Sequence, residues 1–280
     1  MYKQIKGDHD LGQLQIYYTV IYIFMFLFGV CVGSFLNVCI YRLPLGESLI
    51  KRNSHCMSCG EEIKRYDLIP IISWCILRGK CRHCGAKISA RYTVVEFLNG
   101  VIWLTTALYF DIVAKPMYIV LTCVMFSAVV VVFFMDWDTQ LINTWVCVFI
   151  GVLAIAEIIL CRGYDKASIT SHIIGAFVVS VPLAIVALVS HEKAMGWGDV
   201  FLMIAAGLYL GTQGALVALA VALITGSIGG LTQKHFNGDS KFAFGPYLSI
   251  GIVVAVFFGE QLGNWYMEFT GLNEMLNETV

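Results

Sequence analysis

Two aspartates stand at the edges of apolar runs that are long enough to cross a membrane. Asp136 directly follows the run 116–135, and Asp199 lies near the start of the run 195–211, after two closely spaced glycines in the stretch MGWGDV. A carboxyl group inside a bilayer is costly and usually has a function. Two such groups that meet share one proton, because repulsion and desolvation disfavour two charges. One group can then take a proton from water while the other polarises a carbonyl, which is the chemistry of aspartic peptidases.

Four cysteines form a second group of residues whose side chains could do chemistry. They make the pairs CMSC (Cys56 and Cys59) and CRHC (Cys81 and Cys84), in a charged stretch of the chain. Paired C-x-x-C turns at this separation are typical of tetrahedral zinc sites, because each turn presents two thiolates to one ion. A disulfide pair and an iron–sulfur centre are the alternatives. Because four thiolates fill the coordination sphere, the predicted zinc ion is structural.

The composition indicates an integral membrane protein. Of the 280 residues, 59% are hydrophobic and only 13% are charged, whereas soluble domains carry roughly 25% charged residues. The net charge of −1 gives no reason to expect a nucleic-acid partner. The predicted fold class is an all-α polytopic membrane protein of about eight transmembrane helices, with a cytoplasmic zinc-binding loop domain between the first and second.

The eight predicted spans follow from the requirement for about 20 apolar residues per crossing. The uncharged run 200–233 is too long for one helix and is divided at GTQG, residues 211–214. A helix starting at Val200 and ending there would be shorter than the roughly 30 Å bilayer core. This helix is therefore expected to begin near Met195, which places Asp199 about one turn below the surface. The predicted spans are 17–40, 93–111, 116–135, 142–160, 169–190, 195–211, 214–232 and 245–262.

The distribution of basic residues predicts the orientation. More than half of the 18 Lys and Arg residues lie in the segment 42–91, which the positive-inside rule places in the cytoplasm. The N-terminus is then outside, as is the acidic C-terminal tail with Glu268, Glu274 and Glu278. Lys193, Lys234 and Lys241 fall in cytoplasmic loops. In this topology both Asp136 and Asp199 lie at the cytoplasmic ends of their helices.

Several motifs in a fixed order carry a resemblance to a known family. They are GVCVGSFLNVCIYRLP (29–44), the two cysteine pairs, SARYTVVEFLNG (89–100), MDWDTQLIN (135–143), MGWGDVFLMIAAG (195–207) and FAFGPYLSIG (242–251). Over about residues 17 to 262 the chain resembles bacterial type IV prepilin peptidases, which are GxGD membrane aspartic proteases.

This resemblance implies an endopeptidase that removes the basic leader of type IV prepilins and pilin-like proteins at the cytoplasmic membrane face. Members with the cysteine-bearing domain also methylate the new N-terminal amine with S-adenosylmethionine. By position, Asp136 and Asp199 match the catalytic pair, and Asp138 is not required. The implied location is the bacterial cytoplasmic (inner) membrane.

The chain departs from the family pattern at four positions. Asn143 stands where the family usually has proline, and Thr144 where it often has aspartate. Trp197 fills the variable position of GxGD, and Phe201 replaces a common lysine. These changes leave the aspartate pair intact and bear on loop geometry and substrate preference.

No glycine-rich nucleotide fingerprint follows a strand, so the sequence does not place the S-adenosylmethionine site. Arg42 and Glu96 are the candidates for cofactor binding. The alternatives are that Arg42 anchors the end of its span and that Glu96 is an interfacial acid paired with Arg91.

The predicted domains follow these assignments. They are an N-terminal segment with the first transmembrane helix (1–41), a methylation-associated zinc domain (42–92), a peptidase core (93–262) and a C-terminal tail (263–280). Two other classes stay open from the residues alone. A proton-coupled transporter with a zinc-stabilised loop would use the aspartates as a relay, and a zinc-bearing membrane scaffold would not need them.

Overall fold

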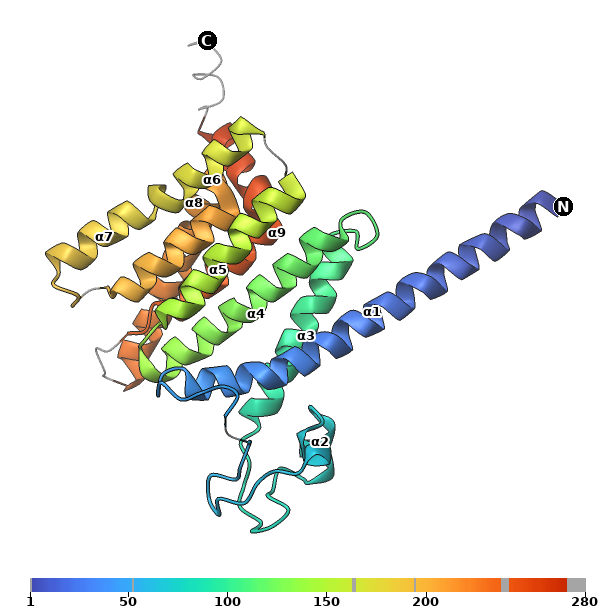
Figure 1. Cartoon of the computed structure of the whole chain (residues 1–280). Coiled ribbons are helices and arrows are strands. Elements are labelled where there is room, and N and C mark those ends of the chain that lie inside the picture. The colour runs from blue at the N-terminus through green and yellow to red at the C-terminus, as the bar shows by residue number, and fades with distance from the viewer. Residues whose placement is uncertain (1, 52, 163–164, 194, 238–241, 271–280) are drawn as a thin grey trace. The chain divides into compact units, whose positions relative to one another are not determined.

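The computed structural model of the chain describes residues 2–51, 53–162, 165–193, 195–237 and 242–270, and these are mostly helical (Figure 1). A 3-10 turn (Arg65–Leu68) and a π-helical turn (Ile158–Arg162) accompany the α-helices. The described ranges contain isolated β-bridges and no extended strand. The α-helices are α1 (Tyr2–Arg42), α2 (Ile72–Ile76), α3 (Arg91–Tyr109), α4 (Pro116–Thr139), α5 (Thr144–Glu157), α6 (Lys166–Val178), α7 (Ser180–Val189), α8 (Trp197–Asn237) and α9 (Gly245–Phe269). The loop between α1 and α3 consists mainly of turns.

The chain divides into two compact units, residues 1–127 and 128–280. The boundary falls within α4, so its first half belongs to the first unit and its second half, with Asp136, to the second. The cysteine pairs lie in the first unit and Asp199 in the second. The four predicted domains stay a prediction.

In the first unit, α1 packs closely against α3 through glycines. A side chain on Gly29 would lie 2.8 Å from Trp103 Cβ, and one on Gly33 would lie 2.7 Å from the Glu96 Cα. Gly100 of α3 lies equally close to α1, because an added Cβ there would lie 2.5 Å from the Val30 side chain. Small residues allow two helix backbones to approach in this way.

A chain of buried hydrogen bonds fixes the same helix pair. The Asn99 amide donates to the Gly29 carbonyl at 2.7 Å and accepts from the Ser127 hydroxyl at 2.9 Å. The Trp103 indole N–H in turn donates to Ser127 at 3.0 Å. These bonds satisfy polar groups that lie away from water. The hydrogen bonds account for Asn99 in the motif SARYTVVEFLNG, and the close approach of α1 accounts for Gly100 beside it.

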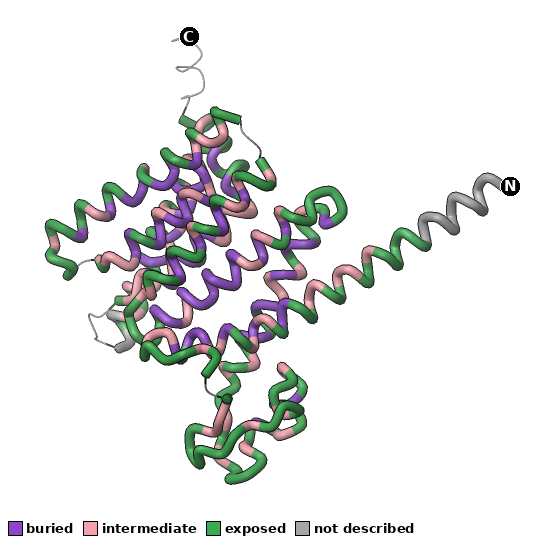
Figure 2. Tube along the Cα trace, in the orientation of Figure 1, coloured by how far each residue is buried: buried purple, intermediate pink, exposed green. Residues whose placement is uncertain are grey.

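In the second unit, α5, α6, α8 and α9 lie side by side, and their buried residues face one another (Figures 1 and 2). The helix α8 is not straight, because Gly211 has φ 74° and ψ 180°. A straight helix would hold Asp199 and Gly229 about 45 Å apart. Instead, Gly229 packs on Tyr247, near the start of α9. At that start, the Gly245 N–H bonds the carboxylate of Asp136, which interacts electrostatically with Asp199. The chain therefore reverses direction at Gly211, within the stretch where the sequence predicts a break.

The two arms of α8 each pack against another helix through glycines. On the first arm, His172 of α6 bonds the Leu208 carbonyl at 2.8 Å, and Gly175 of α6 touches Gly207 backbone to backbone. On the second arm, Gly251 of α9 rests on the backbone of Ala218. The interiors of these pairs have no room for a larger side chain.

Six helical segments among the described residues are long and apolar enough to cross a membrane. They are Gln13–Arg42, Pro116–Thr139, Thr144–Arg162, Lys166–Val189, Trp197–Gln233 and Gly245–Phe269. The predicted count of eight differs because α3 is not among these segments and α8 is one segment with a reversal inside it. The count of eight and the orientation stay predictions. Arg52, Lys241, Glu274 and Glu278, which entered the orientation argument, lie outside the described residues.

We expect Gly207→Ala to lower stability and Gly151→Ala to leave it nearly unchanged. A Cβ at Gly207 would collide with the Gly175 carbonyl, whereas one at Gly151 would meet only Ala205 Cβ at 3.9 Å. Overpacking of this kind costs about 1–3 kcal/mol. Thermal unfolding of the two variants in the same detergent measures the difference. Equal stability of both variants would contradict the close α6–α8 contact.

Candidate active site

Asp136 lies in the last turns of α4 and is only 5% exposed. Its Oδ2 accepts a hydrogen bond from the Gly245 N–H at 2.9 Å. Gly245 is the first residue of α9, and the N–H groups of a first helical turn have no partner within the helix. A side chain at Gly245 would lie 2.7 Å from the same oxygen, so this approach requires glycine.

Asp199 lies in the first turn of α8 and is 8% exposed. Its Oδ2 accepts a hydrogen bond from the Gly196 N–H at 3.3 Å. Its Oδ1 is buried and has no hydrogen-bond partner among the described residues. The helix begins at Trp197, upstream of Asp199 and within two residues of the predicted start near Met195, a difference of the size usual at helix ends. The predicted depth of one turn below the membrane surface stays a prediction. The carboxyl group is buried because other helices cover it.

The glycines before Asp199 have separate roles. A Cβ at Gly198 would lie 2.8 Å from Ile142 Cβ, in the segment that joins α4 to α5. Gly196 supplies the N–H that holds Oδ2. The sequence GWGD therefore lets the start of α8 lie directly against the chain that leaves Asp136.

The two carboxyl groups lie close enough to interact electrostatically. Both belong to the second unit, and they reach this position from α4 and α8. The predicted pair is thus brought together. Asp138 is exposed on the same helix end.

Two residues near this pair were not assigned a role from the sequence. Gly245 was noted only as part of FAFGPYLSIG, and its N–H bonds Asp136. Asn143, where the family usually has proline, caps α5 by accepting the Trp145 N–H at 2.9 Å. The Pro at the second position of α9 signals a helix start, but only the fold shows which carboxylate lies beside it.

The four cysteines of the first unit come together. Their sulfur atoms all lie within 4.8 Å of one another, and those of Cys56 and Cys84 are 3.8 Å apart. Tetrahedral zinc with bonds of about 2.3 Å places its sulfur ligands about 3.8 Å apart. The cluster is therefore able to hold one metal ion, and its donor set fits zinc.

The two cysteine turns have the same backbone hydrogen bonds. Gly60 N–H donates to the Cys56 carbonyl at 2.8 Å, and Gly85 N–H donates to the Cys81 carbonyl at 3.0 Å. Both glycines have positive φ, 74° and 71°, a conformation that suits glycine. In the first turn, the backbone N–H groups of Cys59 and Ser58 lower the pKa of the Cys56 thiol to about 6. Such a thiol readily supplies the thiolate that a metal needs.

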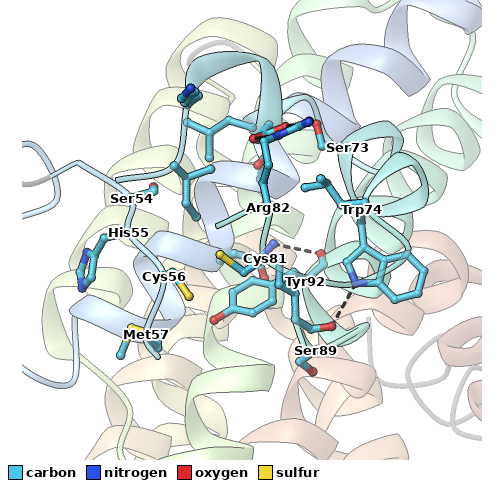
Figure 3. Close-up of a pocket in the computed structure, with 18 of the residues that line it drawn as sticks. Ser54, His55, Cys56, Met57, Ser73, Trp74, Cys81, Arg82, Ser89 and Tyr92 are labelled. Atoms are coloured by element: carbon cyan, nitrogen blue, oxygen red, sulfur yellow. Dashed lines mark hydrogen bonds and ion pairs between the residues drawn. The ribbon is translucent and has the colours of Figure 1, made fainter. Parts of the chain in front are cut away.

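A cavity of about 610 Å³ lies beside the cysteine cluster, within the first unit (Figure 3). Its walls come from the ends of α1 and α3 and from the loop between them. Arg42 and Glu96 both line it, and both are buried, at 6% and 7% exposure. Glu96 bonds the Ile71 N–H, at 2.8 Å to its Oε2, and the Ser34 hydroxyl. The predicted alternative of a pair with Arg91 is not among the interactions of this carboxylate with the described residues.

The fold and these sites define a class of protein. The chain is a multi-pass helical membrane protein with two buried aspartates at one helix-bundle end and a separate four-cysteine cluster. Two family models match it, the "Bacterial Peptidase A24 N-terminal domain" over residues 27–110 and the "Type IV leader peptidase family" over residues 123–231. The second match contains both aspartates, and the first contains the cysteines and the cavity.

Individual relatives agree with the family models, and each of the following is called a prepilin leader peptidase/N-methyltransferase. One from Legionella pneumophila is 30% identical, with 89% of this chain and 95% of that protein covered. One from Aeromonas hydrophila is 29% identical, with 87% and 92% covered. One from Myxococcus xanthus is 32% identical over 228 residues, with 76% and 66% covered. No solved structure matches the chain.

The chain therefore belongs to the type IV leader peptidase family, and it is an enzyme of the peptidase class. The transporter and scaffold alternatives are set aside on this ground.

We expect Cys56→Ser combined with Cys59→Ser to abolish stoichiometric metal binding. Two of the four sulfur ligands are then lost, and structural zinc sites contribute directly to folding. Elemental analysis of the purified protein measures the metal, and limited proteolysis reports on the loop. Cys75→Ser is the control, because Cys75 is exposed and lies outside the cluster. Full metal content in the double variant would exclude the cluster as the site.

Proposed function

We propose that this chain is an aspartic endopeptidase that removes the leader of type IV prepilins and pilin-like proteins. The observation that carries this proposal is that Asp136 and Asp199, from different helices, are both buried and lie near enough to interact electrostatically. The names of the relatives supply the substrate class.

In the proposed mechanism the two carboxyl groups share one proton. The ionised group takes a proton from an attacking water, and the protonated group donates a hydrogen bond to the oxygen of the scissile carbonyl. The bond from Gly245 N–H fixes the orientation of Asp136. Asp199 Oδ1 is free of protein partners among the described residues, so this oxygen can serve the water or the substrate.

The proposed site of action is the cytoplasmic face of the inner membrane. A prepilin with an apolar helix in the bilayer and a basic leader in the cytoplasm presents the bond between them at the membrane surface. The basic segment 42–91 supports the orientation that places the aspartates on that side.

We also propose that the enzyme methylates the new N-terminal amine, with a structural zinc ion in the four-cysteine cluster. S-adenosylmethionine, when bound, supplies a methyl group activated by its sulfonium. The specific observations that favour this second activity are the cysteine cluster and the cavity beside it. The role of the chain is to hold the donor and to keep the loop 42–91 in one conformation.

We expect Asp136→Asn and Asp199→Asn each to reduce leader removal by about a thousandfold or more, because each removes one member of the acid–base pair. Asp138→Asn should retain activity, since this aspartate is exposed on the same helix end. Purified protein in detergent is incubated with a prepilin peptide, and mass spectrometry reads the cut. Normal cleavage by either of the first two variants would reject the pair as catalytic.

A further inference from the structure

The cavity of the first unit is lined by two buried groups of opposite charge, the Arg42 guanidinium and the Glu96 carboxylate. No ion pair is recorded for either side chain in the described parts of the chain. A buried charge without an opposite partner is costly. Two such charges in the wall of one cavity are suited to a ligand that carries both signs.

Arg42 ends α1 and uses only part of its hydrogen-bonding capacity. Its Nη1 donates to the carbonyls of Ser48 and Leu49 at 3.2 and 3.4 Å, and its Nη2 donates to the Asn53 carbonyl at 3.4 Å. A guanidinium has five N–H donors and pairs best with a carboxylate, often through two parallel bonds. The loop carbonyls thus position the group and leave donors for a ligand carboxylate.

Glu96 lies on α3 and is held by the loop. Its Oε2 accepts the Ile71 N–H at 2.8 Å, and the Ser34 hydroxyl also bonds this side chain. Ile71 has φ 61°, a conformation that is strained for a β-branched residue. Strained backbone of this kind is concentrated at functional sites. An ionised carboxylate accepts about four hydrogen bonds, so Glu96 retains capacity for a ligand ammonium.

Two further features of the cavity point to a ligand. The hydroxyl of Thr93, which also lines the cavity, is buried without a partner among the described residues. Aromatic side chains, Trp74 and Tyr92, line the same space (Figure 3). The Trp74 indole is fixed by its bond to the Ile88 carbonyl at 3.1 Å. Aromatic faces of this kind stack on planar heterocycles.

We propose that this cavity is the binding site for the methyl donor, with Arg42 holding the α-carboxylate and Glu96 the α-ammonium of S-adenosylmethionine. The aromatic side chains would then take the adenine ring. The volume of about 610 Å³ lies in the usual range for sites of small-molecule ligands. This assignment rests on the proposed methylation activity, and it gives separate roles in one cavity to the two residues that the sequence offered only as candidates.

The test measures binding and not turnover. Isothermal titration calorimetry of the full-length protein in detergent is performed with S-adenosylhomocysteine, which carries the same amino-acid group and adenosine. We expect Glu96→Gln to weaken binding at least about tenfold, the usual effect of losing a hydrogen bond to a charged group. The matched control is Glu47→Gln, because Glu47 is exposed in the same loop and does not line the cavity.

A second ligand separates direct contact from a structural effect. 5′-Methylthioadenosine lacks the amino-acid group, so its affinity should be the same for the wild type and Glu96→Gln. If the wild-type protein binds S-adenosylhomocysteine but not 5′-methylthioadenosine, the second ligand gives no comparison. The S-adenosylhomocysteine affinities of Glu96→Gln and Glu47→Gln then decide whether the assignment holds. Arg42→Gln should weaken S-adenosylhomocysteine in the same way, with Arg65→Gln as its exposed control outside the cavity.

The outcomes distinguish this assignment from the proposed function. Unchanged S-adenosylhomocysteine affinity in Glu96→Gln, or an equal loss with Glu47→Gln, would overturn the assignment and leave methylation standing. Equal loss of both ligands in Glu96→Gln would show a structural role and also overturn it. A wild-type protein that cleaves prepilin but does not bind S-adenosylhomocysteine would overturn both the assignment and the methylation activity, and leave the peptidase.

Discussion

The second unit depends on one constraint, the placement of two carboxyl groups beside each other in a buried position. Such a placement requires the end of α4 and the starts of α8 and α9 to lie at one level. Glycines meet this requirement, because Gly198 lets α8 lie against Ile142 and Gly245 lets α9 approach Asp136. The hydrogen bond from Gly245 then satisfies one carboxylate oxygen of Asp136.

The reversal of α8 at Gly211 is what makes this arrangement possible. It returns the chain to the end at which Asp199 lies, so that α9 can begin beside Asp136. The reversal itself rests on polar contacts from α6, since the Ser171 carbonyl accepts the Thr212 hydroxyl at 2.8 Å and His172 bonds the Leu208 carbonyl. Residues at the far end of the bundle therefore support the geometry of the aspartate pair.

The loop of the first unit is held together by other interactions than those that hold the second unit. This loop has few buried apolar residues, and short-range features hold it together: the paired cysteine turns, the ion pair of Asp67 with Arg82 at 2.6 Å, and the bonds from Arg42 and Glu96 to the loop backbone. Arg82 holds the pKa of the Asp67 carboxyl below its usual value. A metal ion at the cluster would join the two cysteine turns, and the cavity lies where this loop meets α1 and α3.

The sequence by itself indicated the membrane class, singled out the two aspartates and predicted that the four cysteines form one cluster, because these inferences follow from local composition and fixed spacing. It also placed the break in the run 200–233, since GTQG is a turn signal. Only the tertiary structure decided that Gly245 bonds Asp136, that Gly198 lies against Ile142, and that Arg42 and Glu96 face one cavity. Those relations join residues distant in the chain, and periodicity and spacing carry no information about which helices pack together.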